Sequence, residues 1–181
     1  MKPEEARRVL AEADLIYSAA EVASAIERLA TEITARLEDV QPLVLTVMGG
    51  GIVFAGRLLP CLPFPLEHDY LHVTRYGNAT SGNELKWVVE PRMTVAGRVV
   101  LVLDDILDEG ITLAAIKARL LAQGARECLV AVLSEKELGR TKPVRADFVG
   151  LRLPNRYVFG CGMDVAGAWR NLPAIFAVKG A

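Results

Sequence analysis

The chain has 181 residues, which is enough for one domain with a sizeable core. Hydrophobic residues make up 52% of it and charged residues 24%, and the formal net charge is −1. This composition is globular, and the charge balance gives no footprint for nonspecific nucleic-acid binding. No apolar stretch approaches the roughly 18 residues of a membrane span. We therefore expect a soluble single domain over residues 1–181, without nucleic-acid or membrane partners.

Three cysteines, Cys61, Cys128 and Cys161, are widely spaced and form no C-x-x-C pair. This pattern predicts buried, unpaired thiols in a reducing compartment rather than a disulfide framework or a zinc site. The first eight residues are charged and lack the apolar core of a secretory signal. We therefore expect a cytoplasmic protein.

The first half of the chain alternates helical and extended patterns. A helix is predicted over residues 3–13, and a second begins after Ser18, whose spacing to Glu21 is that of a capping box. Apolar residues follow it at helical intervals: Val22, Ile26, Leu29, Ile33 and Leu37. A strand over residues 43–48 then ends in three glycines, a helix over 52–59 is stopped by Pro60, and residues 64–74 are extended.

The segment 75–91 is polar and contains several Gly and Asn residues between two confident strands. A long connection of this kind in a compact domain indicates a functional lid or disorder. We expect a mobile loop here, and the alternative is an ordinary solvated loop.

The second half continues the alternation with a strand over 98–103 and a helix over 112–122. That helix carries Leu113, Ile116, Leu120 and Leu121 on one face and ends at Gly124. Strands over 128–133 and 148–151 follow. Alternating apolar strands and helices predict an α/β fold with a mostly parallel central sheet flanked by helices. Ligands of such sheets bind at the carboxyl ends of the strands.

An acidic run follows the strand over 98–103 and is the most informative stretch of the chain. It holds Asp104, Asp105, Asp108 and Glu109, and then Gly110, Ile111 and Thr112 begin a helix. Carboxylates accept hydrogen bonds from sugar hydroxyls and suit Mg²⁺, and a helix N-terminus favours phosphate. The run therefore indicates a ribose phosphate with a metal ion. The alternative is a strand followed by an acid-capped helix.

This run resembles the phosphoribosyl-diphosphate motif of the type I phosphoribosyltransferases. The resemblance implies that Asp104 and Asp105 hold the ribose hydroxyls beside Mg²⁺ and that Asp108 lies near the base. It also implies that residues 109–112 cradle the 5′-phosphate. Most members carry Thr where this chain has Glu109, so only the backbone of Glu109 is assigned to binding.

The resemblance narrows to the hypoxanthine-guanine phosphoribosyltransferases. Met48 and Gly49 match the diphosphate loop of that family, whose first peptide is often cis, although many relatives have Lys in place of Gly49. Tyr76 matches the start of the mobile catalytic loop, whereas Arg75 departs from the pattern. Without the resemblance, the glycines would be a structural turn and the Arg-Tyr pair unremarkable.

The last third of the chain carries the residues that the resemblance implies for the base and the diphosphate. Lys136 would donate to the purine 6-oxo group, Tyr157 would stack on the base, and the Val158 backbone would contact its edge. Asp164 would meet Mg²⁺ on the diphosphate, and Arg170 would bind the diphosphate. The structural alternatives are a surface lysine, a core aromatic, a helix-capping Asp and a turn-anchoring Arg.

The resemblance thus implies a single phosphoribosyltransferase domain with a small base-binding hood formed by residues 152–181. The implied reaction transfers 5-phosphoribosyl from phosphoribosyl diphosphate to N9 of hypoxanthine or guanine, with Mg²⁺ as cofactor. The resemblance also implies a homodimer or homotetramer. One rival is an enzyme for xanthine, adenine or a pyrimidine, and another is an RNA-binding regulator of this fold, which the charge balance does not support.

Overall fold

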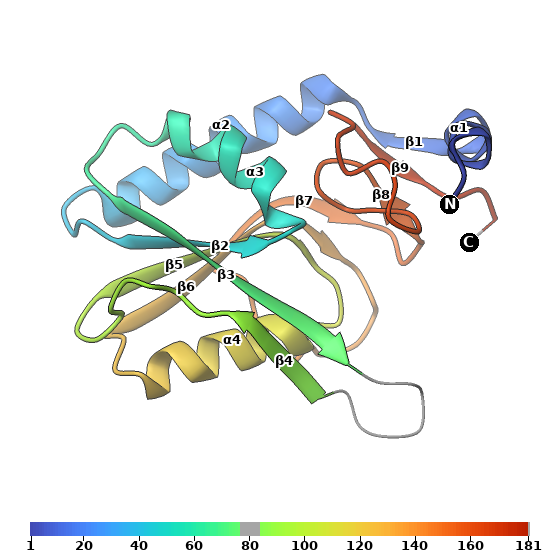
Figure 1. Ribbon diagram of the computed structural model, residues 1–181. Coiled ribbons are helices and arrows are strands. Elements are labelled where there is room, and N and C mark those ends of the chain that lie inside the picture. The colour runs from blue at the N-terminus through green and yellow to red at the C-terminus, as the bar shows by residue number, and fades with distance from the viewer. Residues whose placement is uncertain (77–83, 181) are drawn as a thin grey trace.

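A computed structural model describes residues 1–76 and 84–180, and its centre is a six-stranded sheet (Figure 1). The strands lie in the order β4-β3-β2-β5-β6-β7. Their bounds are β2 Leu43–Met48, β3 Glu67–Tyr76, β4 Glu84–Val89, β5 Val99–Leu107, β6 Glu127–Lys136 and β7 Phe148–Leu153. All neighbouring pairs are parallel except β3 with β4. The predicted α/β class with a mostly parallel sheet is confirmed.

Helices cover both faces of this sheet. Helices α2 (Ala19–Leu37) and α3 (Gly51–Leu58) lie on one face and α4 (Ile111–Ala122) lies on the other, and a short 3₁₀ turn, η1 (Leu59–Cys61), follows α3 (Figure 1). Side chains of β5 alternate between the two cores, with Leu101 and Leu103 in one and Val100 and Val102 in the other. Burial on both faces explains why this strand reads as a continuous apolar run.

The predicted start of α2 is confirmed in detail. The Ser18 hydroxyl accepts a hydrogen bond from the Glu21 N–H, and the Glu21 carboxylate accepts one from the Ser18 N–H at 2.8 Å. The apolar residues expected on its buried face are buried. On α4 the expectation is wrong for Leu121, which is exposed, whereas Leu113, Ile116 and Leu120 are buried.

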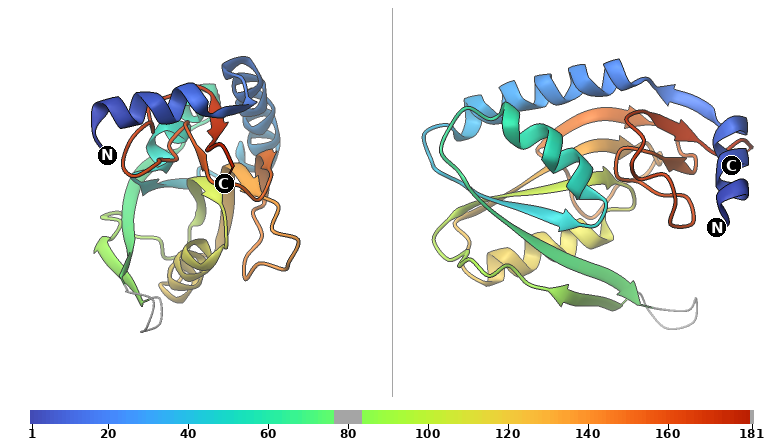
Figure 2. Two further views of the ribbon diagram at one scale, coloured as in Figure 1. Left: turned by 90° about the vertical axis from the view of Figure 1, so that its right-hand side faces the viewer. Right: turned by 45° about the horizontal axis from the view of Figure 1, so that its top comes forward.

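A second, smaller sheet joins the two ends of the chain. Strands β1 (Asp14–Tyr17), β9 (Ile175–Ala177) and β8 (Val158–Phe159) pair antiparallel in the order β1-β9-β8 (Figure 2). Helix α1 (Pro3–Glu12) packs beside it, because the Trp169 indole N–H donates to the Ala6 carbonyl at 2.7 Å. The sequence analysis did not predict β1, β8 or β9.

The segment 75–91 differs from the expected unstructured connection. Residues 84–89 form β4, which pairs with β3 so that Thr74 lies opposite Lys86. The Arg119 guanidinium on α4 lies 4.6 Å from the centre of the Trp87 ring, which anchors this strand. The tip of the expected mobile loop, residues 77–83, lies outside the described residues.

Two smaller expectations concern the cysteines and the membrane. Cys128 and Cys161 are buried, and burial raises the pKa of each thiol to about 11. The expectation of a buried thiol is wrong for Cys61, which is exposed at the end of η1. Within residues 1–76 and 84–180, no helix has the length and apolar character needed to cross a membrane.

The sheet topology places a crevice at the carboxyl ends of β2 and β5. From β2 the chain crosses through α3 to β3 on one side, and from β5 it crosses through α4 to β6 on the other side. The two crossovers therefore diverge from neighbouring strands onto opposite faces (Figure 2). A crevice at such a switch point is where open α/β sheets bind ligands.

Candidate active site

The acidic run begins inside β5, which holds Asp104 and Asp105, and ends in the turn after it, which holds Asp108 and Glu109. We expected the strand to end at residue 103, but it continues to Leu107. Asp104 is half-buried and Asp105 is buried, and beyond them Ile106 packs on the core of Leu101 and Leu103 while Leu107 packs on the core of Val100 and Val102. The end of β5 therefore presents two adjacent carboxylates at the crevice, and Asp108 follows directly after the strand.

Asp104 and Asp105 are adjacent carboxyl groups, the first half-buried and the second buried. Burial, and next the charge of Asp105, raise the pKa of Asp104 well above its usual range. Burial likewise raises the pKa of Asp105, while the Arg170 guanidinium opposes the shift in both groups. The Asp104 carboxylate also accepts the Asp105 N–H at 3.0 Å. Hydroxyl donors or a cation placed here would stabilise the ionised pair.

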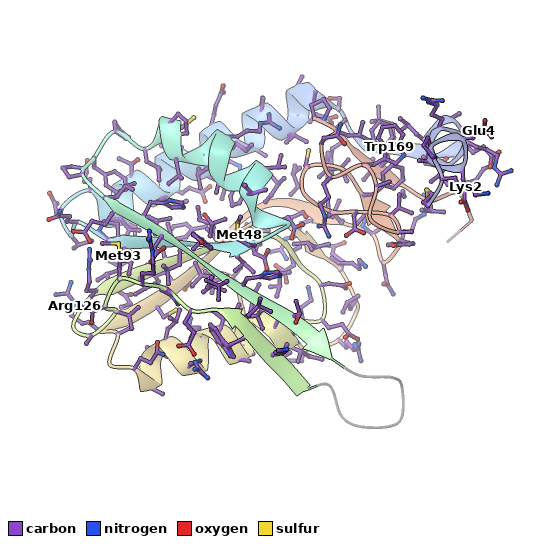
Figure 3. The ribbon with its side chains drawn as sticks, in the orientation of Figure 1. Lys2, Glu4, Met48, Met93, Arg126 and Trp169 are labelled. Atoms are coloured by element: carbon purple, nitrogen blue, oxygen red, sulfur yellow. The ribbon has the colours of Figure 1, made fainter. Side chains whose placement is uncertain are left out.

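The glycine loop after β2 lies directly against this end of β5. A Cβ added to Gly50 would lie 2.0 Å from an Asp105 carboxylate oxygen, and one added to Gly51 would lie 2.9 Å from the Leu103 carbonyl. At Gly49 a Cβ would meet nothing within 4 Å. The Met48–Gly49 peptide is cis, and Figure 3 shows Met48 at the end of β2. Close approach of the loop thus requires glycine at 50 and 51 but not at 49.

The turn between β5 and α4 forms a second part of the crevice. Gly110 precedes α4 with φ +83°, a left-handed conformation that favours glycine, and Ile111 and Thr112 begin the helix. The N-terminal turn of a helix directs backbone N–H groups toward an anion. The Glu109 carboxylate lies beside this turn and pairs with the Arg140 guanidinium at 3.0 Å.

Two adjoining pockets occupy the crevice. One of about 210 Å³ is lined by Val47, Val73, residues 104–110, Thr112 and Leu113. The other, of about 190 Å³, is lined by Asp105, Ile106, Asp108, Lys136, Tyr157, Val158, Met163, Asp164 and Arg170. Both share Asp105, Ile106 and Asp108, so the acidic residues lie between them. We call the first the phosphate-turn pocket and the second, which is lined by residues of the expected hood, the hood-side pocket.

The hood-side pocket has two charged pairs. The Lys136 ammonium, at the end of β6, lies 3.0 Å from the Asp108 carboxylate. The Arg170 guanidinium lies 2.5 Å from the Asp164 carboxylate and donates to the Gly162 carbonyl at 2.6 Å. Tyr157 is 48% exposed, which leaves its ring available to a ligand. A planar molecule with hydrogen-bonding edges fits between an aromatic face and such groups.

Most residues predicted for the site meet in these pockets, and some do not. Met48, Gly49 and Ile111 lie near the crevice but line neither pocket. The side chain of Tyr76, the last residue of β3, lies outside the described residues. The sequence analysis missed Ile106 and Met163, which line the hood-side pocket. The position of Ile106 inside the acidic run, between Asp105 and Asp108, was the signal that could have identified it.

The acidic residues expected to bind the metal do not form a complete metal cage. Among residues 1–76 and 84–180, no three or more His, Cys, Asp or Glu side chains are grouped as metal ligands. The two oxygens of Asp164 already accept from Arg170 and from the Gly167 N–H at 2.7 Å. A metal ion here would need ligand atoms from a substrate.

Comparisons with known proteins agree with this geometry. The Phosphoribosyl transferase domain family matches residues 12–166. Hypoxanthine-guanine phosphoribosyltransferase of Bacillus subtilis is 33% identical over 166 residues, which are 91% of this chain and 92% of that protein. The Bifunctional protein TilS/HprT of Listeria innocua is 36% identical over the same share of this chain, which spans 26% of that longer protein.

A solved structure of a hypoxanthine-guanine-xanthine phosphoribosyltransferase is similar along nearly its whole length. It matches with a TM-score of 0.83 and 30% identity, covering 92% of this chain and 96% of that one. The fold is therefore shared with proteins of one enzyme class. The chain belongs to the phosphoribosyltransferase family and is a member of its hypoxanthine-guanine group.

Proposed function

We propose that this protein transfers 5-phosphoribosyl from phosphoribosyl diphosphate to N9 of hypoxanthine or guanine, releasing diphosphate. The single observation that supports it best is the Lys136–Asp108 pair beside the exposed Tyr157 ring. A 6-oxopurine presents an acceptor at O6 and a protonated N7 on one edge. Lys136 can donate to the first and Asp108 can accept from the second.

The phosphoribosyl group would lie on the other side of the acidic strand. Asp104 and Asp105 would accept from the ribose hydroxyls, and donors there would favour the ionised form of two carboxyl groups whose pKa is raised by burial. The backbone N–H groups of residues 109–112 would hold the 5′-phosphate at the N-terminus of α4. The backbone at Met48 and Gly49 and the side chain of Arg170 would contact the diphosphate.

Mg²⁺ suits this donor set as an ion carried largely by the substrate. It keeps several waters and binds through one or two carboxylates together with phosphate oxygens. Asp104, Asp105 and Asp164 are the carboxylates proposed for it. When bound, Mg²⁺ would supply charge neutralisation on the diphosphate.

The chain's own residues would drive the transfer by orientation and charge. Attack of N9 on C1 of the ribose breaks the C1–O bond, and the diphosphate leaves with the bonding electrons. Arg170 would stabilise the charge on that leaving group. Asp108 would take the N7 proton of the base, and its negative charge would stabilise the developing positive charge on the ribose.

Substrate choice, location and assembly are finer parts of the proposal. Lys136 and Tyr157 support a 6-oxopurine over adenine or a pyrimidine, and xanthine remains the alternative base. Tyr76 is proposed to act on the reacting sugar, and residues 152–181 to bind the base. A cytoplasmic location and a homodimeric or homotetrameric state stay predictions.

Steady-state assays with each base test the proposal. Purified protein with phosphoribosyl diphosphate and Mg²⁺ should form IMP and GMP, and formation should cease when EDTA removes the metal. Lys136→Met should cost about 1.5–3 kcal/mol in recognition of hypoxanthine, because it removes one charged hydrogen bond. Activity on adenine alone, or on no base, would contradict the proposal.

A further inference from the structure

The structure assigns to Lys142 a positioning role: its buried ammonium fixes the two strand ends that carry Asp108 and Lys136. This inference rests on the proposed function, in which those two residues bind the purine edge. Lys142 lies six residues beyond the end of β6, in a polar segment that the sequence analysis did not single out. Its side chain is only 8% exposed.

The hydrogen bonds of Lys142 are directed at the ends of two neighbouring strands. The ammonium donates to the carbonyl of Leu107, the last residue of β5, at 2.9 Å. It also donates to the carbonyl of Lys136, the last residue of β6, at 2.6 Å. Its third contact is the Glu135 carboxylate at 3.2 Å. An ammonium has three donors, so all are used within the protein and none is left for a ligand.

The residues held in this way are those that would contact the base. Asp108 directly follows the carbonyl that Lys142 binds on β5, and Lys136 itself supplies the carbonyl bound on β6. Beyond the pair of Leu107 and Glu135 the two strands no longer pair with each other. One buried cation therefore spans the point where the ladder between β5 and β6 stops, and it sets the separation of the Asp108 and Lys136 side chains.

This separation matters because O6 and N7 lie on one edge of a purine. Both groups can be contacted together only if donor and acceptor are correctly spaced, and Asp108 and Lys136 lie 3.0 Å apart. Lys142 is accordingly a positioning residue and not a catalytic one. Its removal should leave Glu135 compensated, since the Arg152 guanidinium pairs with the other oxygen of that carboxylate at 2.6 Å.

Lys142→Met tests the inference by a split in the kinetic constants. We expect KM for hypoxanthine to rise about tenfold, since one misplaced charge-assisted hydrogen bond is worth that order. KM for phosphoribosyl diphosphate should change less than about threefold, because Asp104 and Ile106, on either side of Asp105, remain paired with β6. Lys142→Arg, which keeps a cationic donor, should recover part of the loss.

Lys117→Met is the matched control. Lys117 on α4 pairs with Asp147 at 3.7 Å, away from both pockets, so both KM values should stay at the wild-type level. If Lys142→Met does not fold, Lys142→Gln replaces it. An unchanged KM for hypoxanthine, or equal rises in both KM values, would overturn the positioning role while the wild-type activity stands. An inactive wild-type protein would overturn the proposed function and this inference with it.

Discussion

At the scale of single residues, Asp104 is proposed to bind the ribose, but its carboxyl group lowers the stability of the folded protein at neutral pH. Burial and the neighbouring charge raise the pKa of Asp104, so folding favours its protonated form. Stability from this group is therefore full below the unfolded pKa of 3.8 and is lost as pH rises through the raised folded pKa. Because of this residue, the free energy of unfolding of the unliganded protein should be smaller at neutral pH than in mild acid.

Asp104→Asn should remove that loss while keeping a carbonyl acceptor for the Asp105 N–H. Thermal unfolding should show a higher Tm than wild type at pH 8, with the gain shrinking as pH falls toward 4. Each kcal/mol gained corresponds to about 2–4 °C in a chain of this length. A Tm difference that is constant across this range would show that the carboxyl group titrates normally in the folded state.

The charge of Glu109 beside the phosphate turn is balanced by Arg140, and both side chains are partly exposed. Arg140→Gln should raise KM for phosphoribosyl diphosphate about two- to fivefold, the range of an exposed ion pair, and the effect should weaken with added salt. Adding Glu109→Gln to that variant should restore the constant. Failure of the double variant to recover would mean that Arg140 does not act through Glu109.

At the scale of elements, the glycine loop after β2 packs closely against β5 at Gly50. Gly50→Ala should displace the Asp105 carboxylate, because a Cβ there would lie 2.0 Å from its oxygen. We expect a loss of about tenfold or more in kcat/KM for phosphoribosyl diphosphate. Gly56→Ala on α3 is the matched control, because a Cβ there would meet nothing within 4 Å and the position lines neither pocket. Comparable losses in both variants would argue against the packing of this loop on β5.

The elements that were predictable from the sequence are those with strong local signals. The capping box of Ser18 and the apolar run of β2 act within a few residues, so propensity and pattern suffice to identify them. Strands β1, β8 and β9 have two to four residues each, and β1 pairs with a segment far along the chain. Such pairing is fixed by tertiary contacts rather than by local sequence.

The candidate site divides in the same way. The acidic residues at the end of β5 were predictable, because they are close together in sequence and several carboxylates at the end of a buried strand are unusual. Lys142 was not, since a lysine in a polar segment reads as a solvated surface residue, and only the fold brings its ammonium to two strand ends. Ile106 was missed because it is an ordinary apolar residue and because β5 continues beyond the expected end at residue 103.

At the scale of the whole molecule, the small sheet connects the N-terminal segment to the hood. Asp14 lies opposite Ala177 in the ladder and also pairs with Arg156, which directly precedes Tyr157. Trp169, beside Arg170, is held by its hydrogen bond to α1, and Figure 3 shows it next to that helix. The N-terminal segment therefore supports the base side of the hood through β1 and the diphosphate side through α1.

Two truncations should separate these supports. Removing residues 1–12 takes away the carbonyl that accepts from the Trp169 indole, so the loop bearing Arg170 loses an anchor. KM for phosphoribosyl diphosphate should then rise about threefold or more, because one neutral hydrogen bond is worth about that factor. Removing residues 1–17 also takes away β1, leaving β9 without that neighbour and Arg156 without Asp14, so KM for hypoxanthine should rise as well. Trp169→Phe, which keeps a ring but lacks the N–H, should reproduce the first effect alone. Steady-state kinetics and Tm values of all three variants test whether the N-terminal segment supports substrate binding. A lower Tm with both KM values unchanged would show that the segment only stabilises the fold.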